Sequence, residues 1–324
     1  MLTIHGVRDG RFIEQQVDVD QAEAGPPPGI VWFDLYQPTA AEQDLVEGWL
    51  EMDIPTRAER EEIEASSRLY SEGGTSFLTG TIVRGAKHAR GESATVTFAL
   101  THHHLVTVRH ADLAAFSALR RYARRQPRTC GSAPATFAAL LDTLVERIAD
   151  VLEAGRGELD DLSREIFAER TGTSDRDYRD MLGRIGTLGN FVSKARESLL
   201  SLARLVAFAR QLEVFEDTRV AGRLVTIAQD INSLTDHAAF LNNKITFSLD
   251  ATLGMISIQQ NAIIKIFSVV AVVFLPPTLI ASIYGMNFEV MPELQWVYGY
   301  PAALLAMLVS AVLPYLFFKY RGWL

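Results

Sequence analysis

Cysteine is nearly absent from this 324-residue sequence, which contains only Cys130. A single cysteine excludes an internal disulfide framework and agrees with a reducing cytosol. The first ten residues also lack the apolar run of a signal peptide. We therefore expect that no N-terminal signal exports the part of the chain that precedes its C-terminal apolar stretches.

The motifs of common enzyme classes are missing as well. The sequence has no Walker lysine motif, no nucleophile elbow and no His-Glu-x-x-His. Three consecutive histidines, His102, His103 and His104, suggest a metal cluster, but they join two β-type segments, and neighbours on a strand point to opposite faces. We expect a solvated hairpin turn there, no catalytic residues and no cofactor.

Charge is absent from two long C-terminal stretches, 266–284 and 296–318. Each would span roughly 30 Å as a helix, the thickness of the hydrocarbon core of a bilayer. Both are apolar on every face, whereas a surface helix of a soluble domain keeps a polar face. The sequence predicts two transmembrane helices, at about 262–284 and 296–318.

The flanking charges predict the orientation of this pair. Lys265 precedes the first stretch, and Lys319 and Arg321 follow the second. Because basic residues stay on the cytoplasmic side, we expect both termini in the cytoplasm and the connecting loop outside. The only charged residues between the two flanks are Glu289 and Glu293, both in that loop.

The remainder of the chain is acidic. The net charge is −8, and without the three basic and two acidic residues of the C-terminal region it is −9 on residues 1–261. This balance argues against nucleic acid as a partner and suits a domain that attracts cations.

Residues 1–130 are expected to form a small α/β domain. β-type runs occur at 2–7, 30–35, 76–83, 95–100 and 105–108, and helical patterns at 40–51 and 57–66. Ser132 and Pro134 then begin a long helix, and a second one starts near Ser174.

Residues 131–261 are expected to form a stalk of long helices. The third helix carries an apolar heptad stripe, made of Val220, Leu224, Ile227, Ile231, Leu234, Ala238, Leu241 and Ile245. No proline interrupts it before Pro276, so the stalk should continue into the first span. Its stripe requires partner helices, either from the same chain or from copies of it. The fold class is therefore an α+β membrane protein with an N-terminal cytoplasmic α/β domain, a stalk and a transmembrane domain at 262–324.

One face of the first span can be followed backwards from Asn287 in helical steps. It contains Ser282, Thr278, Leu275, Ala271, Ser268, Ile264 and Asn261. A slight rotation would exchange Phe267 for Ser268. Polar ends with apolar side chains between them are typical of a pore with a hydrophobic gate. The alternative is that the small residues pack against neighbouring helices.

The C-terminal motifs resemble the CorA family of magnesium and cobalt transport proteins. The similar residues are Phe274-Leu275-Pro276-Pro277-Thr278, Tyr284-Gly285-Met286-Asn287-Phe288 and Met291-Pro292-Glu293-Leu294. The Gly-Met-Asn triplet between two C-terminal spans is the family signature, and chain length and layout agree along the whole sequence.

The resemblance implies a homopentamer in the bacterial inner membrane that carries Mg²⁺, together with Co²⁺ and Ni²⁺. The first span would line the pore, the second would face lipid, and Gly285, Met286 and Asn287 would form the selectivity filter. Five Asn287 carbonyls would contact a hydrated cation, because Mg²⁺ dehydrates reluctantly. Glu289 and Glu293 would surround the external mouth and concentrate cations there.

The sequence departs from the family at one position of the stalk. Some family members have a cytosolic magnesium sensor that uses a stalk carboxylate, but here Thr226 occupies that position, with Asp230 one turn later. The alternative functions are a zinc transporter of the related subgroup and a membrane-tethered coiled-coil sensor or scaffold. The intact triplet favours magnesium over zinc, and the polar face of the first span argues against a simple anchor.

Overall fold

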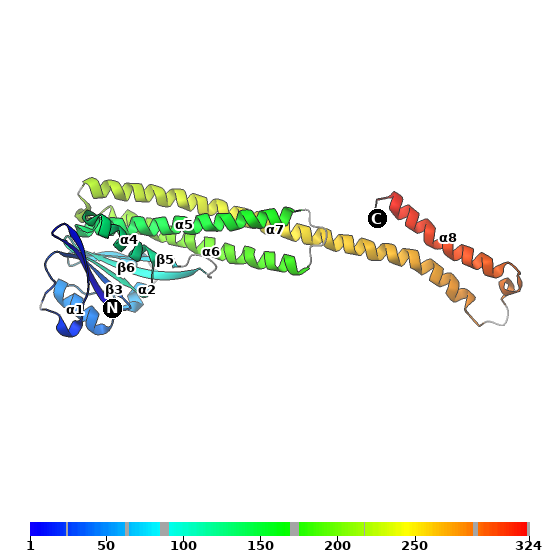
Figure 1. Ribbon diagram of the computed structural model, residues 1–324, viewed down its shortest axis with the longest axis horizontal. Coiled ribbons are helices and arrows are strands. Elements are labelled where there is room, and N and C mark those ends of the chain that lie inside the picture. Colours follow the sequence, from blue (N-terminus) through cyan, green and yellow to red (C-terminus); the bar gives the residue numbers. More distant parts are fainter. Residues whose placement is uncertain are drawn as a thin grey trace. The chain divides into compact units, whose positions relative to one another are not determined.

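The computed structural model describes residues 1–23, 25–61, 65–84, 91–168, 175–216, 218–287 and 291–322 (Figure 1). It divides into two compact units, Met1–Arg170 with Arg179–Leu249 and Thr171–Tyr178 with Asp250–Leu324. The three-part division at residues 130 and 261 stays a prediction.

The first unit contains a seven-stranded sheet. Its strands are β1 (Leu2–Arg8), β2 (Arg11–Gln16), β3 (Ile30–Tyr36), β4 (Leu69–Glu72), β5 (Thr75–Arg84), β6 (Glu92–Leu100) and β7 (Leu105–Arg109). The order across the sheet is β2-β1-β3-β7-β6-β5-β4. Only β3 and β7 are parallel neighbours; the other neighbouring pairs are antiparallel.

Helices cover both faces of this sheet (Figure 1). The short helices α1 (Ala40–Leu50), α2 (Arg57–Glu61) and α3 (Ala65–Arg68) lie on one face, and α4 (Ala114–Arg125) lies with the long helices on the other. Strand β3 divides its side chains between the two, because successive residues point to opposite faces. Phe33 belongs to the core cluster with Val46 of α1, whereas the Trp32 ring lies 6.0 Å from that of Phe116 in α4.

Local sequence signals account for where the main helices begin. Thr39 caps α1 and exchanges hydrogen bonds with Glu42 in a capping box. Ser132 accepts a hydrogen bond from the backbone of Ala135 at the start of α5 (Ala133–Phe167), as its position in the sequence predicts. Helix α6 spans Asp175–Ala209, so the expected cap at Ser174 lies outside the described residues.

Helix α7 (Thr218–Tyr284) packs against α5 and α6 through its heptad stripe. Leu224, Ile227, Ile231, Ala238, Leu241 and Ile245 are all buried. Gly189 of α6 lies beside Ile245, because a Cβ there would be in ordinary van der Waals contact with that side chain at 3.6 Å. Arg223 pairs with Asp142 of α5 at 2.6 Å, and Lys244 pairs with Asp160 of α5. The partner helices of this stripe therefore come from the same chain.

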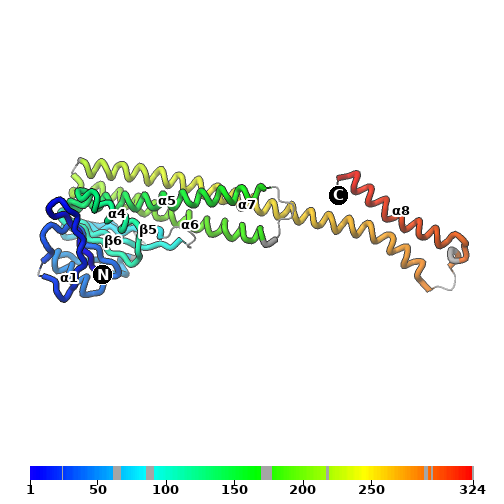
Figure 2. The backbone as a smooth tube through the Cα atoms, in the orientation of Figure 1, coloured from blue at the N-terminus to red at the C-terminus, as the bar shows by residue number. Residues whose placement is uncertain are grey.

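The second unit contains the end of α7 and helix α8 (Gly299–Tyr320). The 67 residues of α7 correspond to about 100 Å of continuous helix. Pro276 and Pro277 lie inside it, and the orange part of the tube curves before its end (Figure 2). With the α/β domain, the long helices and the two apolar helices in place, the expected fold class is confirmed.

Three elements were not predicted from the sequence. Strands β2 and β4 are short edge strands of mainly polar residues, and no helix was expected between the last β-type run and the long helix at Ser132, where α4 lies. The short 3₁₀ helices are η1 (Val19–Gln21), η2 (Pro127–Cys130), η3 (Glu213–Phe215) and η4 (Pro292–Gln295).

Candidate functional site

The candidate site lies on one face of α7 in the second unit. The residues named for this face, Asn261, Ile264, Ser268, Ala271, Leu275, Thr278 and Ser282, are all exposed in the isolated chain. The two large apolar members are among the more open, with Ile264 60% and Leu275 66% exposed. Phe267, the alternative to Ser268, is 70% exposed. The described residues therefore leave this surface open.

A different face of the same helix is shielded. Val269 is buried, and Val273, Pro276, Pro277 and Ile280 are half-buried. At 100° per residue these positions centre about 150° away from the candidate face. The first span therefore has one face partly covered within the chain and an opposite face with polar ends that is left open.

The hydroxyl groups of the open face differ in their hydrogen bonding. Ser268 donates to the carbonyl of Ile264 at 2.8 Å, and Thr278 donates to that of Phe274 at 2.7 Å. Such bonds back to the helix satisfy a hydroxyl without any partner across the face. Within the described ranges, Asn261, Ser282 and Asn287 have no side-chain hydrogen bond.

Helix α7 ends immediately before the Gly-Met-Asn triplet. The amide of Gly285 donates to the carbonyl of Ala281 at 2.9 Å, and that of Met286 donates to Ile283 at 3.3 Å. Gly285 does not adopt a positive φ. A Cβ at this position would lie only 3.1 Å from the Ala281 carbonyl oxygen. The last helical turn therefore approaches this position closely, without a left-handed reversal. Met286 and Asn287 are exposed.

The acidic residues of the connecting loop are Glu289 and Glu293. Glu289 lies outside the described residues, and Glu293 lies in η4 without a described side chain. Whether they form an acidic mouth stays a prediction.

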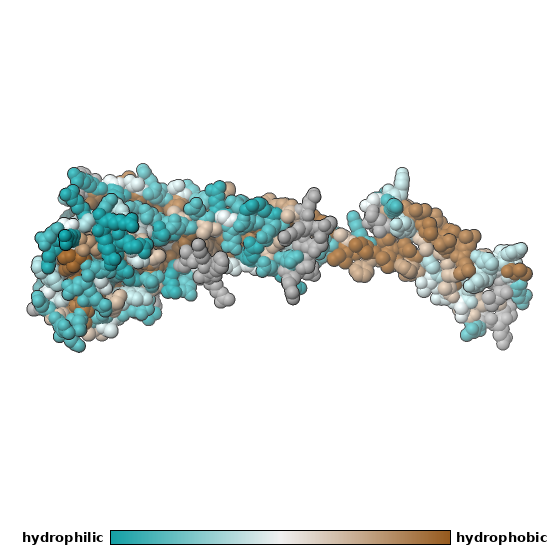
Figure 3. Space-filling view, viewed as in Figure 1, coloured by the Kyte–Doolittle hydropathy of each residue, from teal (hydrophilic) through white to brown (hydrophobic). Residues whose placement is uncertain are grey.

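The surroundings of the candidate site suit a bilayer. The last part of α7 and all of α8 are long and apolar enough to cross a membrane and are almost entirely unburied. Figure 3 shows hydrophobic surface along these two helices, in contrast to the hydrophilic first unit. The second helix begins at Gly299, three residues after the expected start at residue 296.

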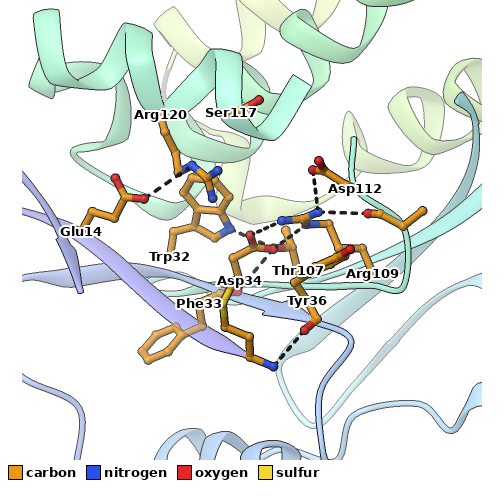
Figure 4. Close-up of polar contacts among 12 residues, drawn as sticks. Glu14, Trp32, Phe33, Asp34, Tyr36, Thr107, Arg109, Asp112, Ser117 and Arg120 are labelled. Carbon is orange, nitrogen blue, oxygen red and sulfur yellow. Dashed lines mark hydrogen bonds and ion pairs between the residues drawn. The ribbon is translucent and has the colours of Figure 1, made fainter. Parts of the chain in front are cut away.

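The main polar cluster of the first unit is a buried ion pair (Figure 4). Arg109 donates from Nε and Nη2 to the two carboxylate oxygens of Asp34 at 3.1 and 2.9 Å, and both side chains are at most 3% exposed. Thr107 donates to Asp34 at 2.9 Å and accepts from the Trp32 indole. The Arg109 guanidinium also lies 4.5 Å from the ring centre of Tyr36. The polar groups of Asp34, Thr107 and Arg109 hydrogen-bond to one another, so we interpret the cluster as structural. No sequence signal links Asp34 to Arg109, because they lie 75 positions apart.

The remaining candidates do not form a metal site. Thr101 and His104 close a tight turn between β6 and β7, with His102 and His103 exposed at its corner. Burial lowers the pKa of half-buried His104. Among the described residues, no group of three or more His, Cys, Asp or Glu side chains could hold a metal ion. Thr226 and Asp230 are exposed on α7, and no carboxylate cluster identifies a cytosolic sensor in the described ranges.

Comparisons with known proteins agree along the whole chain. Residues 28–320 match the family model of the CorA-like Mg²⁺ transporter protein. The magnesium transport protein CorA of Escherichia coli (strain K12) is 36% identical over 329 residues, covering 100% of both chains. The CorA protein of Salmonella typhimurium (strain LT2) is 38% identical over 299 residues, covering 91% of this chain and 92% of that protein.

The fold also matches a solved structure of a protein with the same description. The complete CorA magnesium transporter of Methanocaldococcus jannaschii superposes with a TM-score of 0.80 at 18% sequence identity. The match covers 100% of this chain and 99% of that one. At this identity the likeness demonstrates a shared fold.

Proposed function

Since this chain belongs to the family of CorA-like Mg²⁺ transporter proteins, we propose that it conducts Mg²⁺ inward through a homopentameric pore lined by α7. Divalent cation transport across a membrane is the activity its relatives support. The proposal adds four points to this activity: the pentamer, the pore-lining residues, the filter, and the passage of Co²⁺ and Ni²⁺.

The observation that carries the proposal is the open face of the first span. In a lone helix this face would present Asn261, Ser282 and Asn287 to lipid or headgroups without a hydrogen-bond partner in the described chain. Polar groups inside a membrane are costly unless they face other polar groups or water. Copies of the chain arranged around an axis would turn these faces toward a common aqueous path.

Leu275 and Ile264 would form two apolar rings on that path. Both side chains are open, and between them Ser268 and Ala271 are too small to close a ring. Apolar rings gate by excluding water when the pore narrows. We propose Leu275 as the constriction nearer the filter and Ile264 as the deeper one.

Gly285, Met286 and Asn287 would select the ion at the external end. The Asn287 amide offers a neutral oxygen, which does not readily compensate Mg²⁺ for its tightly held inner waters, so the hydrated ion would be recognised. Cobalt hexaammine, which keeps its ligands, should then compete with Mg²⁺ for uptake. If it fails to compete at any ionic strength while Mg²⁺ uptake continues, recognition requires inner-shell contact.

The orientation follows from the charges that flank the spans. Lys265, Lys319 and Arg321 would lie at the cytoplasmic surface, with Glu289 and Glu293 outside. The protein would lie in a bacterial inner membrane, with both termini in the cytoplasm.

Uptake of Mg²⁺ into liposomes with an enclosed indicator tests this function. Asn287→Ala should abolish uptake and leave assembly intact, because it removes the carbonyl from the mouth and little packing area. Asn243→Ala, an exposed asparagine of the same helix in the first unit, is the matched control and should behave as wild type. Near-normal uptake by correctly assembled Asn287→Ala protein would refute the filter role.

A further inference from the structure

An arginine surface covers α4 and the η2 turn that follows it. It consists of Arg120, Arg121, Arg124, Arg125 and Arg128. No Asp, Glu or Lys occurs between Leu113 and Leu141, although the whole chain has a net charge of −8. Figure 3 shows strongly hydrophilic surface over α4. The local charge therefore opposes that of the molecule.

One carboxylate meets this surface from a neighbouring strand. Glu14 of β2 lies 3.6 Å from Arg120 and 2.6 Å from Arg124, and Figure 4 shows it reaching toward Arg120. Arg121, Arg125 and Arg128 are exposed and have no ion-pair partner in the described part of the chain. Five guanidinium groups thus share one carboxylate, which leaves four positive charges in excess.

Helix capping does not account for the whole surface. Cations stabilise the last turn of a helix, which explains Arg124 and Arg125. Arg120 and Arg121 lie one turn earlier, four residues from Arg124 and Arg125, where like charges repel. Arg128 lies outside the helix, in η2. The positive charge also acts on His5 in the neighbouring core. Burial is the main cause that lowers the pKa of His5 to about 3, and the charges of Arg120, Arg109 and Arg124 lower it further.

We propose that the arginine surface is a binding site for a phosphate-rich anion. The chemistry favours this class, because all five basic residues are arginines, whose planar forks pair with phosphate oxygens in bidentate geometry. Guanidinium groups on two successive turns suit a ligand with several anionic groups. The Glu14 carboxylate occupies the place between Arg120 and Arg124 that a phosphate group takes. The ligand is a soluble polyphosphate, because α7 runs about 60 Å from Arg223, which pairs with the start of α5 next to η2, to Lys265 before the first span.

Binding of inorganic triphosphate to the full-length protein in detergent, measured calorimetrically in magnesium-free buffer, tests the proposal. We expect saturable binding that weakens with added salt. Arg121→Gln with Arg125→Gln should weaken it by at least about tenfold, since each charge-assisted hydrogen bond is substantial. The control Arg196→Gln with Arg204→Gln removes two charges from exposed positions of α6 and should leave the affinity unchanged.

A third variant separates a built site from general charge attraction. Glu14→Gln removes the internal competitor and should tighten triphosphate binding. All the substituted arginines are exposed, and an unchanged near-ultraviolet spectrum confirms that each variant is folded. Absence of saturable binding at low salt, an equal loss in the α6 control, or weaker binding by Glu14→Gln would each overturn the proposal.

Reconstitution in lipid nanodiscs tests the source of the ligand. For a soluble ligand, the triphosphate affinity should be the same in nanodiscs of anionic and of zwitterionic phospholipid. A lower affinity in the anionic nanodiscs would show that lipid headgroups compete for the arginine surface and would overturn the assignment to a soluble polyphosphate.

Discussion

The two units differ in whether their side chains find partners within the chain. Asp34 and Arg109 of the first unit are buried and paired with each other, whereas Leu275 and Asn287 of the second unit are exposed. The carboxylate and the guanidinium meet at 2.9 Å inside the same domain. Leu275, in contrast, is 66% exposed, and the Asn287 amide has no hydrogen bond in the described chain. The ion pair is completed within one chain, whereas the first span leaves these side chains open in the described chain, where we propose that lipid and further copies cover them.

This difference separates stability from transport. Substitutions in the sheet domain should act first on folding, because its groups are packed and paired. Substitutions on the open face of α7 should act on flux with little effect on the fold of one chain. The four predictions below test that separation.

The largest expected effect is the loss of stability when the buried ion pair of Asp34 and Arg109 is broken. Asp34→Asn leaves the Arg109 charge in the core without its counter-charge, which should destabilise the domain by about 3–5 kcal/mol. Thermal unfolding followed by tryptophan fluorescence measures the change in stability. Asp150→Asn, in an exposed pair with Arg147, is the control and should change little. A small effect at Asp34 would mean that the core relaxes or admits water.

The second prediction concerns His5, which is 0% exposed and stacks on Trp32 at a centroid distance of 4.3 Å. Its folded pKa, about 3, lies below the ordinary 6.5 because of burial. The unfolded chain therefore binds a proton below pH 6.5 while the folded chain does not. The contribution of neutral His5 to the free energy of unfolding is fully present above pH 6.5. It is lost toward pH 3 at about 1.4 kcal/mol per pH unit.

His5→Phe keeps the aromatic stack and should remove this slope. The difference between variant and wild type is then expected to grow by about 2 kcal/mol between pH 6.5 and pH 5. Unfolding curves at several pH values measure it. Parallel pH profiles would show that His5 is hydrated or finds a partner in solution.

The third prediction is on the other side of the comparison. Leu275→Ser should wet the proposed constriction, giving a leakier pore whose flux responds less to cytosolic Mg²⁺. A barrier lower by about 1.4 kcal/mol corresponds to about tenfold more flux. Val270→Ser, on a different face of the same span, is the control and should leave closure unchanged. Normal closure of the Leu275 variant would place the gate at Ile264 or Phe267.

The smallest effect is expected at the contact between Lys244 of α7 and Asp160 of α5. The hydrogen bond from Lys244 lowers the pKa of Asp160 below its ordinary 3.8, so this contribution is present at neutral pH and lost as the pH falls through that lowered value. Both side chains are partly exposed, so solvent screens the pair. Lys244→Met should slightly increase amide exchange along the two helices, without changing ion flux in liposomes. A large change in flux would show that this pair couples the stalk to the pore.

The sequence alone determined the membrane character, the long helices and the open face. Two long uncharged stretches indicate a bilayer by their length and composition. A heptad stripe without proline indicates a long packed helix by its period. Each signal lies within one stretch of sequence, so it can be recognised without knowledge of the surrounding structure. Family motifs predicted the filter at Gly285, Met286 and Asn287.

Only the tertiary structure decided which groups meet. Strands β3 and β7 are parallel neighbours, and this pairing brings Asp34 to Arg109. The edge strand β2 places Glu14 against α4, and α5 and α6 provide the partners of the stalk stripe. These contacts join residues far apart in the chain, and their energies depend on burial and geometry that no local pattern contains. The open face of α7 has no such contacts in the described chain, so the tertiary structure of one chain leaves its proposed partners undecided.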